Sequence, residues 1–149
     1  MIRKADINDI KKIQELINYY AGKDLMLPRS LNELYENIRD FFVYEKNGEI
    51  LGCAALHVTW EDLAEIKSLA VVESEQKRKI GSLLVKAVFE DAKNLKIKRL
   101  FALTYAPSFF EKFGFRKLEH SKLPHKIWSE CIKCFKFPDC QEVALAIDL

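Results

Sequence analysis

The sequence predicts a mixed α/β (α+β) domain, in which a mostly antiparallel sheet of about six to seven strands carries helices on both faces. Three observations predict it. Short apolar runs with strand character recur along the chain, amphipathic helical segments interrupt them, and an Asn-Gly pair joins two of the apolar runs in a hairpin. The 149 residues suit a single domain, which we assign to residues 1–149.

The first third of the chain contains a short strand and two helices. Residues 2–5 are expected to form the strand, and Asp6 can cap the helix that follows. One face of that helix is apolar, through Ile10, Ile13, Ile17 and Tyr20. Ser30 and Glu33 have the spacing of a capping box, which predicts a second helix ending near residue 39.

The middle of the chain is expected to form three antiparallel strands. Residues 41–45 and 50–60 flank Asn47-Gly48, a pair that favours a two-residue hairpin turn because both residues tolerate positive φ. Residues 51–58 are nearly all apolar, which predicts a strand covered on both faces. The strand at 63–71 should lie antiparallel beside it.

The remaining elements alternate between helix and strand. Helical spacing of apolar residues begins at Ile80 and ends near residue 94, and a strand follows at 99–103. A short helix is expected at 109–113, ended by Gly114. Residues 115–119 and 143–148 resemble final strands, whereas 121–141 show little periodicity.

Composition excludes several classes of function. Hydrophobic residues make up 49% of the chain and charged residues 31%, as in soluble globular proteins. The net charge of +2 provides no field for nucleic acid or an acidic membrane surface. No apolar run approaches the roughly 20 residues that span a bilayer, and the first residues lack the apolar core of a signal peptide. We therefore expect a cytoplasmic protein that binds neither nucleic acid nor membrane.

The cations are concentrated instead in one turn between a strand and a helix. Lys77, Arg78 and Lys79 precede Ile80, where the long helix begins. Free backbone N–H groups and the helix dipole favour an anion such as a diphosphate at this point. A run of cations alone is more often a solvated turn. The strand before it and the helix after it favour the anion site here.

The same turn resembles the acetyl-CoA-binding motif of the GNAT superfamily of N-acetyltransferases, and the order of elements resembles the GNAT fold over almost the whole chain. Gln76 and Gly81 match the motif, but Lys79 replaces its first glycine, so glycine's access to positive φ is lost there. The resemblance implies acetyl-CoA as co-substrate. It assigns cofactor binding to Leu69, Ala70, Val71, Gln76, Lys77, Arg78, Lys79, Ile80, Gly81 and Ser82. Residues 110–115 resemble a second signature of the superfamily, with Phe110 where many members carry the tyrosine that protonates the departing thiolate.

Four segments narrow the resemblance to the catalytic domain of bacterial N-acetylglutamate synthase, in a short stand-alone form without the regulatory domain that carries arginine feedback. They are residues 27–30, 52–56, 65–71 and 100–104. This resemblance implies acetyl transfer to the α-amine of L-glutamate, at the start of arginine biosynthesis. A homodimer is expected only because many members of the superfamily dimerise.

An amino-acid amine is protonated at neutral pH and must lose a proton before it attacks a thioester. Glu65, on the strand beside the thioester, is the candidate base, and burial would raise its pKa. The alternative is an ion pair with Lys67, two residues along the strand. Thr104 and Tyr105 are alternative acids for the leaving thiolate, and the sequence does not choose between them.

Glutamate carries two carboxylates, which require fixed cations. Arg29 offers a planar fork on a loop held by Pro28, with Lys67 and Lys126 as weaker candidates. Without the family context, Arg29 would equally be a surface arginine. Cys131, Cys134 and Cys140 could ligate zinc with His120 or His125, but a second pair of ligands is missing. We favour reduced thiols over a zinc site.

Two rival functions stay open. One is a GNAT enzyme that acts on another amine, such as another amino acid, a polyamine or a protein lysine. The other is a non-catalytic CoA-binding module, which the departures at Lys79 and Phe110 favour. The presence of Glu65 and Thr104 argues against that module.

Overall fold

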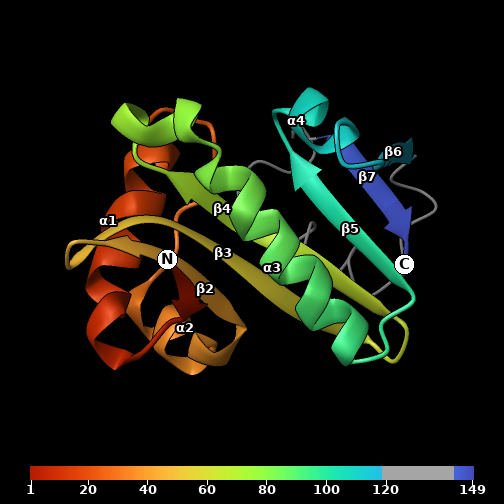
Figure 1. The fold of residues 1–149 in the computed structure, drawn as a ribbon, viewed down its shortest axis with the longest axis horizontal. Helices are drawn as coiled ribbons and strands as arrows, with labels where there is room; N and C mark the ends of the chain where they lie inside the picture. Colours follow the sequence, from red (N-terminus) through yellow and green to blue (C-terminus); the bar gives the residue numbers. More distant parts are fainter. Residues whose placement is uncertain (119–142) are drawn as a thin grey trace.

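The computed structural model describes residues 1–118 and 143–149 and contains one seven-stranded sheet in the order β1-β2-β3-β4-β5-β7-β6 (Figure 1). Its strands are β1 (Ile2–Lys4), β2 (Phe41–Lys46), β3 (Glu49–Trp60), β4 (Leu63–Val71), β5 (Arg99–Thr104), β6 (Arg116–Leu118) and β7 (Val143–Asp148). Every neighbouring pair is antiparallel except β4 and β5, which are parallel. The predicted mostly antiparallel mixed sheet is confirmed.

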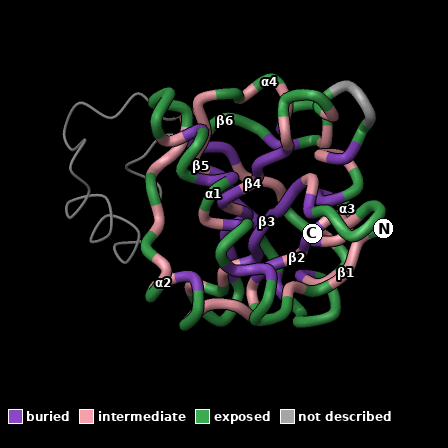
Figure 2. The backbone as a smooth tube through the Cα atoms, turned by 90° about the vertical axis from the view of Figure 1, so that its left-hand side faces the viewer, coloured by how far each residue is buried: buried purple, intermediate pink, exposed green. Residues whose placement is uncertain are grey.

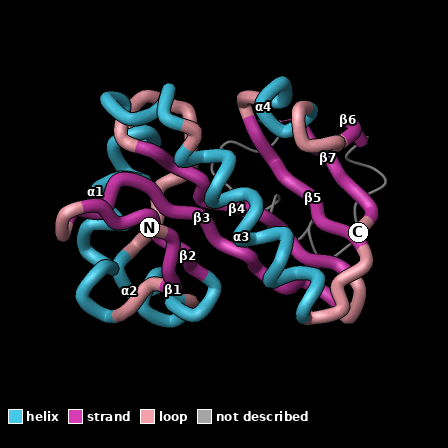
Figure 3. The backbone as a smooth tube through the Cα atoms, viewed as in Figure 1, coloured by secondary structure: helices cyan, strands magenta, loops and turns pink. Residues whose placement is uncertain are grey.

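Helices cover both faces of this sheet, as predicted. The α-helices are α1 (Ile10–Ala21), α2 (Leu31–Glu36), α3 (Ile80–Asn94) and α4 (Pro107–Glu111), and three 3-10 turns are η1 (Ile7–Asp9), η2 (Ile38–Asp40) and η3 (Glu73–Arg78). Figure 3 shows α3 lying across the middle of the sheet and α4 at the end of β5. None of the helices in these described ranges is long and apolar enough to cross a membrane.

Each face of the sheet has its own apolar core. On one face α1 and α2 pack against the first strands through Ile10, Ile13, Leu16, Ile17, Leu34, Phe41, Val43, Cys53 and Ala55. On the other, α3 packs through Ile80, Leu84, Val85, Val88 and Ala92 against Ala54, Leu56, Ala64 and Ile66. The predicted apolar stripe is confirmed at Ile80, Leu84, Val88 and Ala92, but it was wrong at Leu83, which is 41% exposed, because the buried face is centred on Leu84, Val85 and Val88. Figure 2 shows the buried backbone concentrated in β3 and β4, which lie between the two layers of helices.

The turns behave largely as the sequence predicts. Asn47 and Gly48 both adopt positive φ, at 53° and 80°, in the β2–β3 hairpin. Gly114 does the same at 96° after α4. Ser30 accepts a hydrogen bond from the Glu33 amide, which caps α2. The predicted cover on β3 was wrong at Val58, which is 48% exposed near the end of the strand, where the pairing with β4 becomes irregular.

An ion pair between β1 and η1 makes the free energy of unfolding depend on pH. Arg3 on β1 binds the buried carboxylate of Asp9 through two nitrogens, at 2.7 and 3.0 Å, and also reaches Glu45 on β2 at 3.0 Å. Hydrogen bonds from Arg3, and then from the Asp6 backbone, hold the pKa of Asp9 below its usual value. Asp9 therefore stabilises the fold above the unfolded-state pKa of about 3.9, and this contribution is lost as pH falls through the lower folded-state pKa.

We expect the wild type to lose more free energy of unfolding than Asp9→Asn as the pH is lowered from about 5 towards 2. Urea titrations of both proteins across that range measure the difference. Parallel pH curves for the two proteins would show that Asp9 contributes nothing to acid unfolding.

Candidate active site

The sheet opens between β4 and β5, and this opening determines where the site lies. The parallel ladder between them pairs Leu63 to Glu65 with Arg99 to Phe101 and ends there. Both strands continue, β4 to Val71 and β5 to Thr104, and Figure 1 shows their ends diverging. Beyond Glu65, β4 therefore presents backbone groups along an edge that β5 does not occupy.

A β-bulge in β4 sets which backbone groups face that opening. Cys53 pairs with Ala70 and Ala55 with Lys67, so two residues of β4 oppose Ala54, and one of them, Ser68, has a φ of 56°. The buried Cys53 thiol fills the bulge: its Sγ donates to the Ser68 carbonyl oxygen at 3.3 Å and accepts from the Ala70 amide. Burial raises the pKa of this thiol to about 12, so Cys53 stays protonated.

The bulge gives different directions to the backbone groups of Leu69, Ala70 and Val71, which the resemblance assigns to cofactor binding. The Ala70 amide is turned toward Cys53 and β3. The Val72 amide also bonds toward β3, to the Leu51 carbonyl oxygen at 2.9 Å. Because successive residues of a strand alternate, Leu69 and Val71 direct their backbone groups to the open edge. The sequence pattern gave no signal of this bulge, since the run from 63 to 71 reads as one continuous strand.

The N-terminus of α3 lies beside the same opening. No side chain among the described residues caps this helix, so the first amides, of Ile80, Gly81 and Ser82, keep their N–H groups for an external acceptor. Lys79, at the cap, adopts φ 63° and ψ 17° and is exposed. The expected loss of the positive-φ conformation was therefore wrong: the lysine adopts the conformation of the motif's glycine, at a steric cost.

Replacing Lys79 by glycine should therefore raise the free energy of unfolding by about 1 kcal/mol, while removing a cation from the predicted diphosphate site. Lys96→Gly is the matched control, because Lys96 is also exposed and has a φ of 67° at the far end of α3. Both variants should gain stability in urea titrations, and only Lys79→Gly should weaken CoA binding. A lower free energy of unfolding in Lys79→Gly than in the wild type would contradict the inference that positive φ strains Lys79.

The other motif residues differ in what they contact. Gln76 is tied to the protein itself, because its side-chain amide donates to the Tyr20 hydroxyl at 2.8 Å. The Ile80 side chain is buried against β3, so only its backbone can serve a ligand. The backbone of Lys77 and Arg78 belongs to η3, and their side chains lie outside the described part of the structure.

Gly81 lies in a tightly packed position. A Cβ at this position would lie 3.3 Å from the Phe109 ring of α4 and 4.0 Å from Val71. The end of β4, the start of α3 and α4 therefore meet at this glycine. Phe110 and Phe115 are buried in the same core, with ring centroids 5.3 Å apart, which explains their part of the second signature by packing.

Glu65 is 7% exposed, at the point where the ladder between β4 and β5 ends. It stands opposite His57 on β3 and Phe101 on β5, on the face that carries α1 and α2. The His57 ring nitrogen Nδ1 lies 2.9 Å from an Asp40 carboxylate oxygen. The sequence did not predict this histidine–carboxylate pair beside Glu65, because β3 and η2 come together only in the folded chain.

The two candidate acids lie at the end of β5. Thr104 is partly buried, and its Oγ accepts a hydrogen bond from the Ala106 amide at 2.9 Å. That contact fixes the hydroxyl while leaving its proton to be donated. Tyr105 is also partly buried. The structure thus keeps both candidates at the opening.

Arg29 is held in place by its own backbone. Its amide donates to the Asn18 side chain at 3.2 Å, and its carbonyl accepts from the Gln14 side chain at 3.1 Å, both on α1. The guanidinium Nη1 contacts Glu33 at 3.2 Å. Its Nε is buried and has no hydrogen-bond partner among the described residues. A buried guanidinium N–H without an acceptor favours an incoming anion.

Lys67 lies on the same face as Glu65, partly buried and opposite Ala55. Lys126, His120, His125, Cys131, Cys134 and Cys140 lie outside the described residues, so the predictions made for them are not tested. Within residues 1–118 and 143–149 no group of three His, Cys, Asp or Glu side chains could hold a metal ion.

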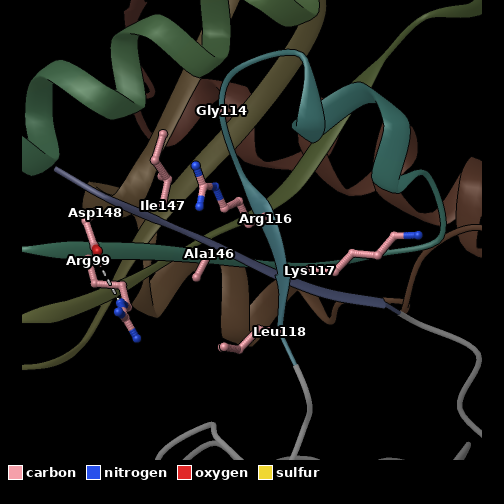
Figure 4. Close-up of a pocket in the computed structure, with 8 residues that line it drawn as sticks. All are labelled: Arg99, Gly114, Arg116, Lys117, Leu118, Ala146, Ile147 and Asp148. Carbon is pink, nitrogen blue, oxygen red and sulfur yellow. Dashed lines mark hydrogen bonds and ion pairs between the residues drawn. The ribbon is translucent and has the colours of Figure 1, made fainter.

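A separate pocket of about 450 Å³ lies on β5, β6 and β7 (Figure 4). It is lined by Arg99, Gly114, Arg116, Lys117, Leu118, Ala146, Ile147 and Asp148. Arg99 is paired with Asp148 at 2.8 Å, and Figure 4 shows Lys117 directed away from this pair. Because it adjoins the first residue of β5, at the opposite end of that strand from Thr104, this pocket is not the opening described above.

Comparisons with known proteins agree with the fold. The family model described as the acetyltransferase (GNAT) family matches residues 7–115. An uncharacterized N-acetyltransferase of Chlorobaculum tepidum is 37% identical over 97% of this chain and 93% of its own length. An amino-acid acetyltransferase of Mycobacterium tuberculosis is 33% identical over 91% of this chain and 79% of its own length.

Two solved structures extend the similarity. The Rv2747 protein of Mycobacterium tuberculosis, in complex with CoA, is 30% identical, with a TM-score of 0.86 over 100% of this chain and 99% of that one. N-acetylglutamate synthase from Neisseria gonorrhoeae, complexed with coenzyme A and N-acetyl-glutamate, is 29% identical, with a TM-score of 0.92. This chain spans 35% of that larger protein.

The family match and the similar proteins define an enzyme class, the acetyl-CoA-dependent N-acetyltransferases. The chain belongs to the acetyltransferase (GNAT) family, and the proteins similar to it include amino-acid acetyltransferases.

Proposed function

We propose that this enzyme transfers the acetyl group of acetyl-CoA to the α-amine of L-glutamate, giving N-acetylglutamate and CoA, as the first step of arginine biosynthesis. The observation that carries the proposal is Arg29, whose buried Nε has no acceptor among the described residues. The Arg29 backbone is held by α1 and its guanidinium contacts Glu33 of α2, and both helices cover the face of the sheet where Glu65 is buried. A carboxylate at Arg29 would place a dicarboxylic amino acid beside a candidate base.

The similar proteins support this choice of acceptor. Amino-acid acetyltransferases are among them, and the Neisseria structure was solved with N-acetyl-glutamate. We propose further that the enzyme acts in the cytoplasm, where a thiol such as Cys53 stays reduced.

In the proposed mechanism the glutamate ammonium first gives a proton to the Glu65 carboxylate, directly or through a water molecule. The free amine then attacks the thioester carbonyl carbon. The oxygen that becomes negative is stabilised by an amide of the open edge of β4, at Leu69 or Val71. The C–S bond breaks, and the departing thiolate takes a proton from the hydroxyl of Thr104 or Tyr105. The acetylated nitrogen then gives its extra proton to that oxygen, directly or through a water molecule, which restores the hydroxyl and leaves the neutral amide and the CoA thiol.

We propose direct transfer in a ternary complex rather than through an acetylated cysteine. Cys53 is the only cysteine among the described residues, and it is fully buried beside the bulge of β4. Burial raises the pKa of its thiol to about 12, which leaves almost no thiolate at neutral pH. Intersecting lines in double-reciprocal plots with both substrates varied are expected, and parallel lines would indicate an acyl-enzyme.

The direct test is thiol release from acetyl-CoA with a panel of amines that contains glutamate, aspartate, glutamine, lysine and spermidine. Glutamate should exceed aspartate in kcat/KM by about tenfold or more, because aspartate is one methylene shorter. A preference for spermidine or lysine would indicate a GNAT enzyme for another amine. CoA binding without thiol release from any amine would indicate a binding module.

A further inference from the structure

A hydrogen-bonded group, buried at Tyr20 and Val71 and exposed at Gln76, joins the end of α1 to the start of the predicted cofactor motif. The Tyr20 hydroxyl donates to the Val71 carbonyl oxygen, at the last residue of β4. The same hydroxyl accepts from the Gln76 side-chain amide at 2.8 Å, and that amide also lies 3.4 Å from the Val71 oxygen. We refer to Tyr20, Gln76 and the Val71 carbonyl as the Tyr20–Gln76 tie.

The Tyr20–Gln76 tie supplies a hydrogen-bond partner for the Val71 carbonyl, which no neighbouring strand among the described residues provides. Val71 directs its backbone groups toward the edge that β5 has left, where a strand would ordinarily accept and donate hydrogen bonds. Tyr20 is 7% exposed, and its hydroxyl takes the place of that missing strand partner. The strand can therefore end beside an open edge without leaving a buried carbonyl unpaired.

The tie also fixes where the diphosphate turn begins. Gln76 lies within η3, three residues before Lys79 and four before the first residue of α3. Its side chain points back to α1 rather than toward a ligand. Burial raises the pKa of Tyr20, so the hydroxyl stays protonated and keeps donating to Val71.

A second contact between the same elements provides a natural comparison. Glu73 on η3 accepts from the Tyr19 hydroxyl at 2.7 Å and from the Lys23 ammonium at 2.6 Å. These groups are exposed, so the contact should contribute little to stability or to loop position. Two adjacent tyrosines on α1 thus bind the same turn, one buried and one at the surface.

We propose that Tyr20 is a positioning residue for acetyl-CoA. It acts through Gln76 and the Val71 carbonyl to hold the end of β4 and the diphosphate turn at the spacing that the cofactor spans. Tyr20 has no part in the chemical step. Its loss should therefore change cofactor affinity far more than acceptor affinity or turnover at saturating acetyl-CoA.

The test compares Tyr20→Phe with Tyr19→Phe by titrating CoA alone in a calorimeter. Tyr20→Phe should weaken CoA binding about tenfold, the size expected when a buried carbonyl and an amide lose one partner. In steady-state assays the KM for acetyl-CoA should rise similarly, with kcat and the acceptor KM within about twofold. Tyr19→Phe should change none of these values.

Gln76→Ala provides a second route should Tyr20→Phe fold poorly. It should weaken CoA binding by itself, and the double variant should lose less affinity than the sum of the two single losses. Unchanged CoA affinity in either folded single variant, or strictly additive losses, would overturn the proposal. Because CoA is titrated without any acceptor, this result is independent of whether glutamate is the substrate.

Discussion

Glu65→Gln should lower kcat by about 100-fold or more and leave the KM for acetyl-CoA nearly unchanged. General base catalysis by a positioned side chain contributes roughly 10²- to 10⁴-fold, and a buried amide cannot accept the proton of the ammonium. Glu65 is buried where β4 and β5 separate, so bulk water has little access to replace it. Initial rates of thiol release at saturating glutamate measure the effect.

The dependence on pH separates a lost base from a disturbed fold. In Glu65→Gln the rate should keep rising with pH, because the fraction of free amine rises without help from the enzyme. Glu61→Gln, at an exposed acid in the β3–β4 turn, is the matched control and should behave as wild type. A Glu65→Gln enzyme with the kcat and pH profile of the wild type would exclude Glu65 as the base.

Arg29→Ala is the second substitution with a large expected effect. It should raise the KM for glutamate by about 100-fold, which corresponds to roughly 2.7 kcal/mol, in the range for a charge-assisted pair with a carboxylate. The KM for acetyl-CoA should stay within about twofold, because Arg29 is fixed to α1 by Gln14 and Asn18 and not to the cofactor turn. Steady-state kinetics with each substrate varied measure both values.

Arg29→Lys and Arg39→Ala make this test specific. Lysine keeps the charge but loses the planar fork, so it should recover only part of the affinity for glutamate. Arg39 is an exposed arginine near α2, and its removal should have no effect on glutamate. Equal KM values for glutamate in wild type and Arg29→Ala would place the carboxylate contact elsewhere.

Local chemistry made much of the fold predictable. The hairpin at Asn47-Gly48, the cap at Ser30 and the apolar stripe of α3 each depend on residues close together in the sequence. The motif around Gly81 likewise combines a strand end with a helix start. These signals predicted both layers of helices and the turn that we propose binds the cofactor.

Contacts distant in sequence were not predictable. Tyr20 reads as one more member of an apolar helix face, but its hydroxyl bonds to residues 51 and 56 positions away. Cys53 reads as a small buried hydrophobe, yet its sulfur completes the bulge at Ser68. Lys79 adopts the backbone conformation of a glycine because the surrounding strand and helix impose it. The bulge and the tie both lie at the opening of the sheet.

The most direct measurement of the proposed activity is a competition experiment. Limiting acetyl-CoA is offered with equal concentrations of glutamate, aspartate, glutamine and lysine, and the acetylated products are identified by mass spectrometry. Because products form in proportion to kcat/KM, we predict N-acetylglutamate as the main product, and its share should fall sharply with Arg29→Ala. A product mixture in which N-acetylglutamate does not dominate, or one that Arg29→Ala leaves unchanged, would contradict the assignment of glutamate as the acceptor.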